Sequence, residues 1–319
     1  MGFVGFHASH EQFPPGELLS LARAAESAGF AHAMCSDHLA PFGEAQGQSG
    51  FAWSWLGAAL EATRMPFGVV TAPGQRYHPA VVAQAAATLA EMYPGRFWVA
   101  FGSGQNLNEH VTGDAWPPPD VRRARLRECV EVVRALWAGE TVTHFGLVRV
   151  AQAKLYTRPA TPPRLFGAAV SPESASLVGG WADGLITVNQ PEPALRRVVE
   201  AFRAGGGEGK PMFLQAHVAY APDEGAALAA AHEQWKTNAL TGPLLWDVPL
   251  PAEFDAAATF VRPEDMRESV RVSSDLGRHR AWLERDRELG FERVYVHEVG
   301  REQRRSLEAF GEHVLPRLG

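Results

Sequence analysis

The stretch CSDHLAPF, residues 35–42, places Asp37 directly before His38, where an apolar run gives way to a proline-containing loop. Histidine can exchange a proton near neutral pH, and a neighbouring carboxylate can orient or charge its ring. A structural histidine, hydrogen-bonded within a loop, is the alternative interpretation. A position at the end of a strand that opens into a pocket favours proton transfer by His38.

Other polar side chains also follow apolar runs. The first run is followed by His7, His10 and Glu11, and the fourth by Gly102, Ser103, Gly104, Gln105 and Asn106. The fifth run is followed by Ala168, Ala169 and Ser171, the seventh ends in Gln215 and His217, and the eighth ends in His297. In a parallel barrel the carboxyl ends of the strands converge, so we expect one shared site. Glu11 is either a carboxylate of that site or a cap for the helix that starts after Pro14-Pro15.

Two further binding sites can be weighed from spacing. His7 and His10 lack the HExxH spacing and a carboxylate cluster, so we expect no metal. Ser171 and Ser174 lie in the first turn of a predicted helix, where backbone N–H groups and hydroxyls could bind a phosphate. Simple N-capping by Ser171 explains the same pattern without a ligand. The GGGEGK stretch at 205–210 follows a helix and precedes a strand, so it is a turn and not a phosphate loop.

Eight short apolar runs alternate with helical stretches, which is typical of βα units around a parallel sheet. The predicted strands are 3–6, 31–35, 67–71, 97–101, 164–168, 184–188, 212–218 and 293–297. Eight units favour a closed (β/α)8 TIM barrel, an α/β fold, in one domain covering residues 1–319.

Three helices have clear apolar stripes. Their residues are Leu18, Leu21, Ala25 and Ala28, closed by Gly29; Val81, Val82, Ala85, Leu89 and Met92; and Leu126, Val130, Val133 and Trp137, closed by Gly139. Four gaps, 38–66, 102–120, 140–162 and 238–275, exceed ordinary connections. We expect the first, second and fourth to lie over or beside the site. Trp53 and Trp55, in the first gap, either form a wall for a flat ligand or anchor the loop.

Composition excludes several classes of partner. The net charge of -6 and the lack of a run of five like charges argue against nucleic acid or an anionic membrane as a partner. No membrane-spanning stretch or signal peptide is evident, so we expect a cytoplasmic protein. Its two cysteines, Cys35 and Cys129, are expected to remain reduced.

The motifs of the chain resemble those of the luciferase-like flavin and deazaflavin oxidoreductases, and especially the F420-dependent glucose-6-phosphate dehydrogenase group. The resemblance covers nearly the whole chain. It is carried by ASHEQF (8–13), SDHLAPF (36–42), the RYHP to TG block (76–113), RLREC (125–129), WADGLIT and the QRRSLEAFGEHVLPRL end.

The resemblance implies a TIM barrel, usually a homodimer, with a flavin or deazaflavin ring at its mouth. His38 then handles the substrate proton, with Glu11 as a pocket carboxylate. Val69-Val70 would form a non-prolyl cis bulge behind the ring. The implied cofactor contacts are Asp37, Val69, Val70, Gly102, Ser103, Gly104, Asn108, Ala168, Ala169, Ser171 and Ser174, and the implied substrate pocket is Phe42, Trp53, Trp55 and Trp246.

Several residues differ from the pattern of this group, and the differences change the expected substrate. Gln105 replaces an acidic glutamate and cannot act as a proton donor in that role. Phe42 replaces a tryptophan. Residues 187–193 and 240–250 carry no basic side chain, so a buried sugar phosphate would lack cationic partners. We therefore do not expect glucose 6-phosphate to be the substrate.

The expected function is hydride transfer between a ring cofactor and a small organic molecule, with His38 and Glu11 handling the proton and Gln105 hydrogen-bonding ligand or ring. The chain also resembles a side branch of this group that returned from the deazaflavin to FMN, so FMN is ranked ahead of coenzyme F420. With FMN, the protein could react with O₂ as a monooxygenase. An acidic chain offers no obvious basic rim for a polyglutamate tail. A deazaflavin-dependent dehydrogenase or reductase, a non-catalytic flavin-binding barrel and a metal-dependent hydrolase are the alternatives.

Overall fold

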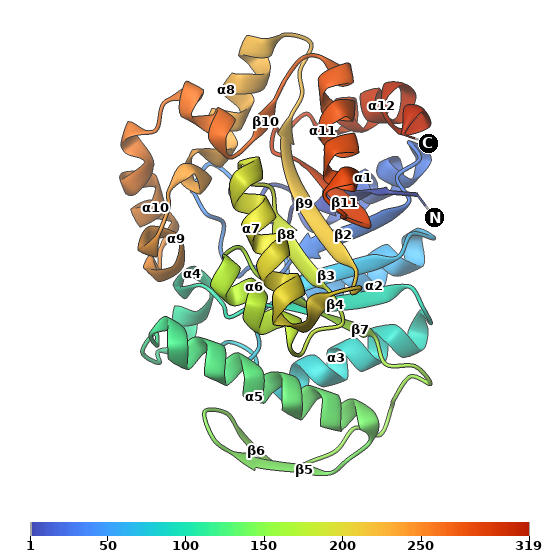
Figure 1. Cartoon of the computed structure of the whole chain (residues 1–319), viewed down its shortest axis with the longest axis vertical. Helices are drawn as coiled ribbons and strands as arrows, with labels where there is room; N and C mark the ends of the chain where they lie inside the picture. Colours follow the sequence, from blue (N-terminus) through green and yellow to red (C-terminus); the bar gives the residue numbers. More distant parts are fainter. Residues whose placement is uncertain (1, 319) are drawn as a thin grey trace.

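The computed structural model describes residues 2–318, and eight parallel strands spread along the sequence close into one barrel (Figure 1). Each barrel strand pairs with the next, and β9 pairs with both β8 and β11, so the ring has no open edge. The barrel strands are β1 (Val4–Ala8), β2 (His32–Ser36), β3 (Phe67–Thr71), β4 (Phe97–Phe101), β7 (Arg164–Ala168), β8 (Leu185–Val188), β9 (Met212–Ala219) and β11 (Arg293–Glu298). The predicted TIM barrel is confirmed.

Most helices cover the outside of the barrel, and the short helices α4 (Asn106–Glu109), α9 (Pro243–Asp247) and α10 (Pro251–Ala257) lie in the long gaps at its carboxyl end. The other helices are α1 (Pro15–Ser27), α2 (Ala52–Ala62), α3 (Pro79–Met92), α5 (Pro119–Ala138), α6 (Pro172–Gly179), α7 (Glu192–Phe202), α8 (Glu224–Trp235), α11 (Leu276–Glu288) and α12 (Gln303–His313). No helix among the described residues combines the length and apolar character needed to cross a bilayer.

Alternation along the strands separates two apolar layers, because successive side chains point to opposite faces. One layer packs between strands and helices and includes Phe6, Val69 and Val99. The other fills the barrel interior with Met34, Trp98, Ala100, Phe166, Ile186, Phe213 and Tyr295. Gly68 belongs to the inner face, where a Cβ would lie 1.9 Å from the Trp98 ring, so only glycine fits.

The buried face of α3 differs from the predicted stripe. Val81 and Met92 are more than half exposed, whereas Val82 and Leu89 are buried together with Ala83, Ala86, Ala87 and Ala90. Alanines supply most of the contact, so the bulkier residues did not mark the packed face. The stripe predicted on α5 is buried, and the helix ends at Gly139 with φ 93°, as the sequence indicates.

Three of the four long gaps meet at the carboxyl end of the barrel. Phe42, Leu107 and Phe254 come from the first, second and fourth gaps and pack in one buried cluster. The third gap instead forms a hairpin, β5 (Val142–Phe145) with β6 (Arg149–Ala153), which lies beside α5 at the lower edge of Figure 1. This hairpin and β10 (Arg271–Val272), which pairs with the end of β9, were not predicted.

Candidate active site

The carboxyl ends of the barrel strands form a mouth whose inward-facing side chains divide into two halves. Four consecutive strands, β9, β11, β1 and β2, carry a polar half made of His7, Ser36, Gln215, His217 and His297. The other four, β3, β4, β7 and β8, carry an apolar half made of Val70, Ala100, Gly102, Ala168 and Val188. The division sets an apolar surface on one side of the mouth and hydrogen-bonding groups on the other.

His38 follows β2 and is held by a carboxylate, but not by its sequence neighbour. Its Nδ1 is hydrogen-bonded to Glu11 Oε1, and Ser9 Oγ donates to Glu11 Oε2 at 2.9 Å. The His38 ring stands edge-on to Phe42, with centroids 5.2 Å apart. With Nδ1 bound to Glu11, Nε2 is the nitrogen left to exchange a proton; it has no partner among residues 2–318 and is not enclosed.

Glu11 is buried and ionised. Burial acts to raise its pKa, but attraction to His38 and the hydrogen bond from that ring outweigh burial and lower the pKa to about 2. The first turn of α1 has no side-chain cap, so the capping interpretation of Glu11 is wrong. Both carboxylate oxygens are occupied, by Ser9 and His38, which makes Glu11 a positioning group for the imidazole.

Asp37 lies in an internal network. Thr71 Oγ1 donates to its Oδ2 at 2.8 Å, Tyr77 OH donates to Oδ1 at 3.1 Å, and Arg76 binds its backbone oxygen at 2.8 Å. Asp37 is 3% exposed. Its carboxylate therefore joins β2 to β3 and the following loop, and its contact with a cofactor stays a prediction. Arg76 and Tyr77 were overlooked, although the RYHP motif contains both.

The segment Val69-Val70 is a regular trans strand, so the predicted cis bulge is wrong. Both residues keep parallel register with β2 and β4, and the Val70 carbonyl accepts from Asp37 N at 2.9 Å. Continuous pairing on both sides leaves no place for an extra or inverted peptide. Val69 points outward into the layer under the helices, whereas Val70 faces the mouth.

The loop after β4 approaches the loop that carries His38. Asn108 Oδ1 accepts from Leu39 N at 2.8 Å, and Asn108 Nδ2 donates to Gln105 Oε1 at 3.4 Å. Gly104 has φ 83°, a conformation that glycine adopts without strain. Asn108 is thus a brace between two loops, and it brings Gln105 to the rim of the site.

A cleft of about 350 Å³ continues outward from the apolar half between α5 and α6. Ser103, Ala168 and Ser174 line it, together with Arg123 and Arg127 of α5. The two arginines were overlooked in the sequence, although their i, i+4 spacing on a predicted helix places them on one face. Arg123 is bound to Glu173 at 2.9 Å in an exposed ion pair.

The turn before α6 is where a phosphate site is predicted. Ser171 caps the helix by accepting from Ser174 N at 3.3 Å, which is the ligand-free role considered above. Ala169 is buried in the layer under the helices and does not face the mouth. Ser174 and Ala168 line the cleft.

Of the predicted substrate pocket, Phe42 lies against His38 but two tryptophans do not. Trp53 packs on Phe97 and Trp55 on Phe67, each the first residue of its strand, so both belong to the layer between α2 and the barrel. These large apolar rings anchor α2 to the barrel, which is the second of the two roles considered for them. Trp246 is half-buried on α9, which contacts α4 through Asn106 Nδ2 and the Asp247 carbonyl at 2.8 Å.

The remaining histidines do not form a metal centre. His7 stacks on His297 at 4.1 Å and its Nε2 lies 3.3 Å from Ser36 Oγ, while His10 packs edge-on against Trp55. Burial lowers the pKa of His7 to about 3 and that of His10 to about 4, so both are neutral at pH 7. Within residues 2–318, no three His, Cys, Asp or Glu side chains are grouped to hold a metal ion.

Relatives of known activity share this chain's length and architecture. An F420-dependent glucose-6-phosphate dehydrogenase of Nakamurella multipartita is 37% identical, over 98% of this chain and 96% of its own. An F420-dependent hydroxymycolic acid dehydrogenase of Mycobacterium tuberculosis is 37% identical, over 86% and 77%. An F420-dependent secondary alcohol dehydrogenase, solved with an F420-acetone adduct, superposes with a TM-score of 0.92 at 31% identity, covering 100% and 99%.

The luciferase-like monooxygenase family model matches residues 1–298, which include all eight barrel strands. This match agrees with the resemblance stated from the motifs, and the relatives share the dehydrogenase class of chemistry. The chain therefore belongs to the luciferase-like monooxygenase family and is an oxidoreductase.

Proposed function

We propose that the protein is a deazaflavin-dependent alcohol dehydrogenase, which also reduces the corresponding ketones, acting on uncharged substrates. The observation that carries this is the mouth itself: His38, with Nε2 open and Nδ1 held by Glu11, stands beside an apolar half that can accept a flat ring. Coenzyme F420 replaces FMN as the first choice because relatives with 31% to 37% identity are named as F420-dependent.

The residues present fit such a cofactor. The apolar half consists of small or β-branched side chains, and a Cβ on Gly102 would meet only Ala168, at 3.6 Å. From there the cleft leads past Ser103 and Ser174 to Arg123 and Arg127. Hydroxyls and guanidinium groups suit a phosphodiester followed by a carboxylate tail. The basic rim that composition did not reveal is thus formed locally by one helix face.

When bound, the deazaflavin ring supplies a carbon that accepts or returns a hydride. His38 Nε2 takes the proton of the substrate hydroxyl as the hydride leaves the adjacent carbon, so an alcohol becomes a ketone and the imidazole becomes protonated. The ionised Glu11 stabilises that imidazolium through Nδ1–H. Gln105, on the rim, hydrogen-bonds the ligand.

The same geometry argues against a phosphorylated sugar. No lysine or arginine is among the inward-facing residues of the polar half, and its histidines are neutral at pH 7. A phosphate dianion there would lose its hydration without gaining a cationic partner. An uncharged alcohol carries no such penalty.

The test is reconstitution of the purified protein with F420 or with FMN, followed by the addition of 2-propanol or acetone. We expect F420 to bind. Its absorbance at about 420 nm should then fall when the alcohol is oxidised. Binding of FMN alone, with oxygen uptake, would replace the proposal with a monooxygenase. Binding of either ring without turnover of any alcohol or ketone would favour a non-catalytic barrel.

A homodimer and a cytoplasmic location complete the proposal, and both are supported by the family resemblance. Light scattering after size-exclusion chromatography of the purified protein measures the first. A mass of one chain would remove the dimer from the proposal.

A further inference from the structure

A chain of hydrogen bonds in the polar half fixes the proton position on His297. Gln12 Nε2 donates to the Val299 carbonyl at 2.7 Å, so the Gln12 amide oxygen is the atom that faces His297. That oxygen only accepts, and it lies 3.3 Å from His297 Nε2, which must therefore carry the proton. Burial holds the pKa of His297 well below its ordinary value, so the ring is neutral and Nδ1 is an acceptor.

Gln215 lies between His297 and His217, so the proton position on His297 also determines the proton position on His217. Its Nε2 lies 3.2 Å from His297 Nδ1 and 3.2 Å from His217 Nε2. Because His297 Nδ1 accepts, the group facing it is the amide NH₂, and the second hydrogen of that NH₂ is donated to His217 Nε2. Burial lowers the pKa of His217 to about 4. A neutral His217 whose Nε2 accepts must carry its single proton on Nδ1.

His217 Nδ1–H is a fixed donor that the protein does not use. It has no acceptor among residues 2–318, and it is not an enclosed atom, since His217 is only half-buried near the end of β9. The ring is held by Gln215 on one edge and by Trp235, whose centroid is 5.2 Å away. The His217 backbone N–H donates to Asn189 Oδ1 at 2.7 Å. A held donor of this kind loses little entropy when it binds an oxygen.

The donor stands at a distance from the proton-transfer histidine. His38 follows β2, and His217 lies on β9, three strands away around the mouth through β1 and β11. Neighbouring strands are spaced about 4.8 Å apart, so three spacings separate the two strands by about 14 Å along the barrel wall, and the inward-pointing rings are closer than that across the mouth. A molecule that reaches both needs two oxygens several bonds apart.

Charge also limits the ligand. Arg271 is the cation that acts on His217, and both its terminal nitrogens are bound to Asp286, at 2.6 and 2.7 Å. With Arg271 bound to Asp286, the neutral His217 N–H favours a neutral oxygen over an anion.

We propose that His217 Nδ1–H is a specificity-determining donor that binds a second, uncharged oxygen of the substrate while His38 serves the reacting one. This inference rests on the function proposed above and deepens it: the substrate class becomes alcohols and ketones that carry a further hydroxyl or carbonyl group, with the two oxygens separated by several bonds. His217 positions the substrate and takes no part in proton transfer.

The first test needs no turnover. In protein labelled with ¹⁵N-histidine, we expect His217 in the Nδ1–H tautomer, and we expect its Nδ1–H resonance to shift with 5-hydroxypentan-2-one but not with pentan-2-one. A proton on Nε2, or no shift at saturating hydroxyketone, would overturn the proposal.

The second test is kinetic. With reduced F420, the wild-type protein should favour the hydroxyketone over pentan-2-one by about tenfold in kcat/KM, as expected for one neutral hydrogen bond. His217→Phe should reduce that preference to near one, chiefly through KM. His144→Phe, the same change on the β5–β6 hairpin, should preserve it. An unchanged preference in His217→Phe contradicts the proposal.

If neither ketone reacts in the wild type, the proposed function fails. The tautomer of His217 and the shift of its Nδ1–H resonance then still decide the role of His217.

Discussion

At the scale of single residues, the reactive imidazole depends on a partner that is distant in sequence. His38 stands beside Asp37 in the chain, yet its Nδ1 is bound to Glu11, which is 27 residues away. Asp37 is already bound by Thr71, Tyr77 and Arg76 and cannot orient its neighbour. The strand end turns the two side chains to opposite sides, so adjacency in sequence did not mean contact.

Replacement of His38 tests its role as the proton-transfer group. His38→Ala should reduce turnover of 2-propanol by about 10²-fold or more, because the hydroxyl proton loses its acceptor. Binding of F420, measured by fluorescence titration, should remain close to that of the wild type. Turnover equal to the wild type would remove His38 from the mechanism.

At the scale of elements, helix α5 lines the cleft beside the barrel with two arginines. Arg123 and Arg127 reach the cleft that begins at Ser103 and Ala168, while the opposite face of the helix is buried in the outer apolar layer. One helix therefore combines a packing role with a charged rim. Both arginines are paired with carboxylates, Arg123 with Glu173 and Arg127 with Glu131, and their local grouping is not visible in a net charge of -6.

Removing this rim should weaken the cofactor complex. The double change Arg123→Ala with Arg127→Ala should raise the dissociation constant of F420 by about tenfold, since two guanidinium groups no longer face its anionic tail. Arg304→Ala with Arg305→Ala on α12 makes the same change in net charge elsewhere and should have little effect. Equal affinities in the wild type and the α5 variant would show that the tail lies outside the cleft.

Strand β3 contains a glycine, Gly68, at a position where a side chain would not fit. A Cβ on Gly68 would lie 1.9 Å from the buried Trp98 ring. Gly68→Ala should lower the free energy of unfolding by about 1–3 kcal/mol through overpacking, as measured by chemical denaturation. Gly57→Ala in α2, with no atom within 4 Å of the new Cβ, should instead stabilise by about 0.5–1 kcal/mol. If Gly68→Ala were as stable as the wild type, the interior packing described here would be wrong.

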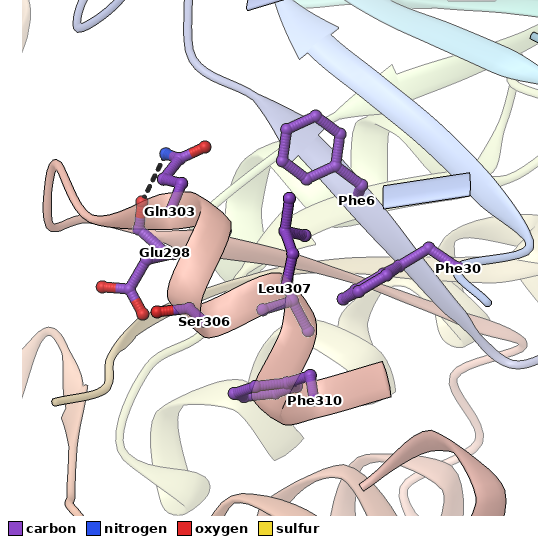
Figure 2. Close-up of a pocket in the computed structure, with 8 residues that line it drawn as sticks. Phe6, Phe30, Glu298, Gln303, Ser306, Leu307 and Phe310 are labelled. Atoms are coloured by element: carbon purple, nitrogen blue, oxygen red, sulfur yellow. Dashed lines mark hydrogen bonds between the residues drawn. The ribbon is translucent and has the colours of Figure 1, made fainter. Parts of the chain in front are cut away.

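At the scale of the whole molecule, the last strand and the last helix bury an acid between them. Glu298 ends β11 and lies beside Ser306 of α12, next to a cavity of about 10 Å³ among Phe6, Leu307 and Phe310 (Figure 2). That volume is the size of one water molecule, so it is a packing void and not a ligand site. Glu298 accepts from Gly300 N at 2.9 Å and from Tyr220 N at 3.0 Å.

This acid should make stability depend on pH. Burial raises the pKa of Glu298 to about 7, against an ordinary value of 4.5. Between these pH values the unfolded chain binds fewer protons, so the contribution to stability is complete below pH 4.5 and is lost as pH rises through 7. The free energy of unfolding should fall by about 1–3 kcal/mol over that window.

Urea denaturation at several pH values measures this slope. Glu298→Gln cannot ionise and should lose the part of the slope that belongs to Glu298. Glu308→Gln, an exposed change on α12, should retain it. Identical slopes in the wild type and Glu298→Gln would assign the dependence to another group.

The sequence alone determined the barrel and most of its polar positions. Eight apolar runs were enough to place the strands within about two residues of their observed bounds, because parallel strands buried on both faces read as continuous apolar segments. Residues after those runs had to converge at the mouth, and His38 and Glu11 are in contact there. Gln105 lies on the neighbouring loop, bound to Asn108.

The tertiary structure decided the partners within that site. Three features depend on contacts between distant segments: which carboxylate binds His38, whether Trp53 and Trp55 face a ligand or the helix layer, and which nitrogen of His217 carries the proton. Gln12 and Val299, for example, are 287 residues apart. Residue order does not encode such contacts locally, because they arise only when the barrel closes and fixes the direction of each side chain.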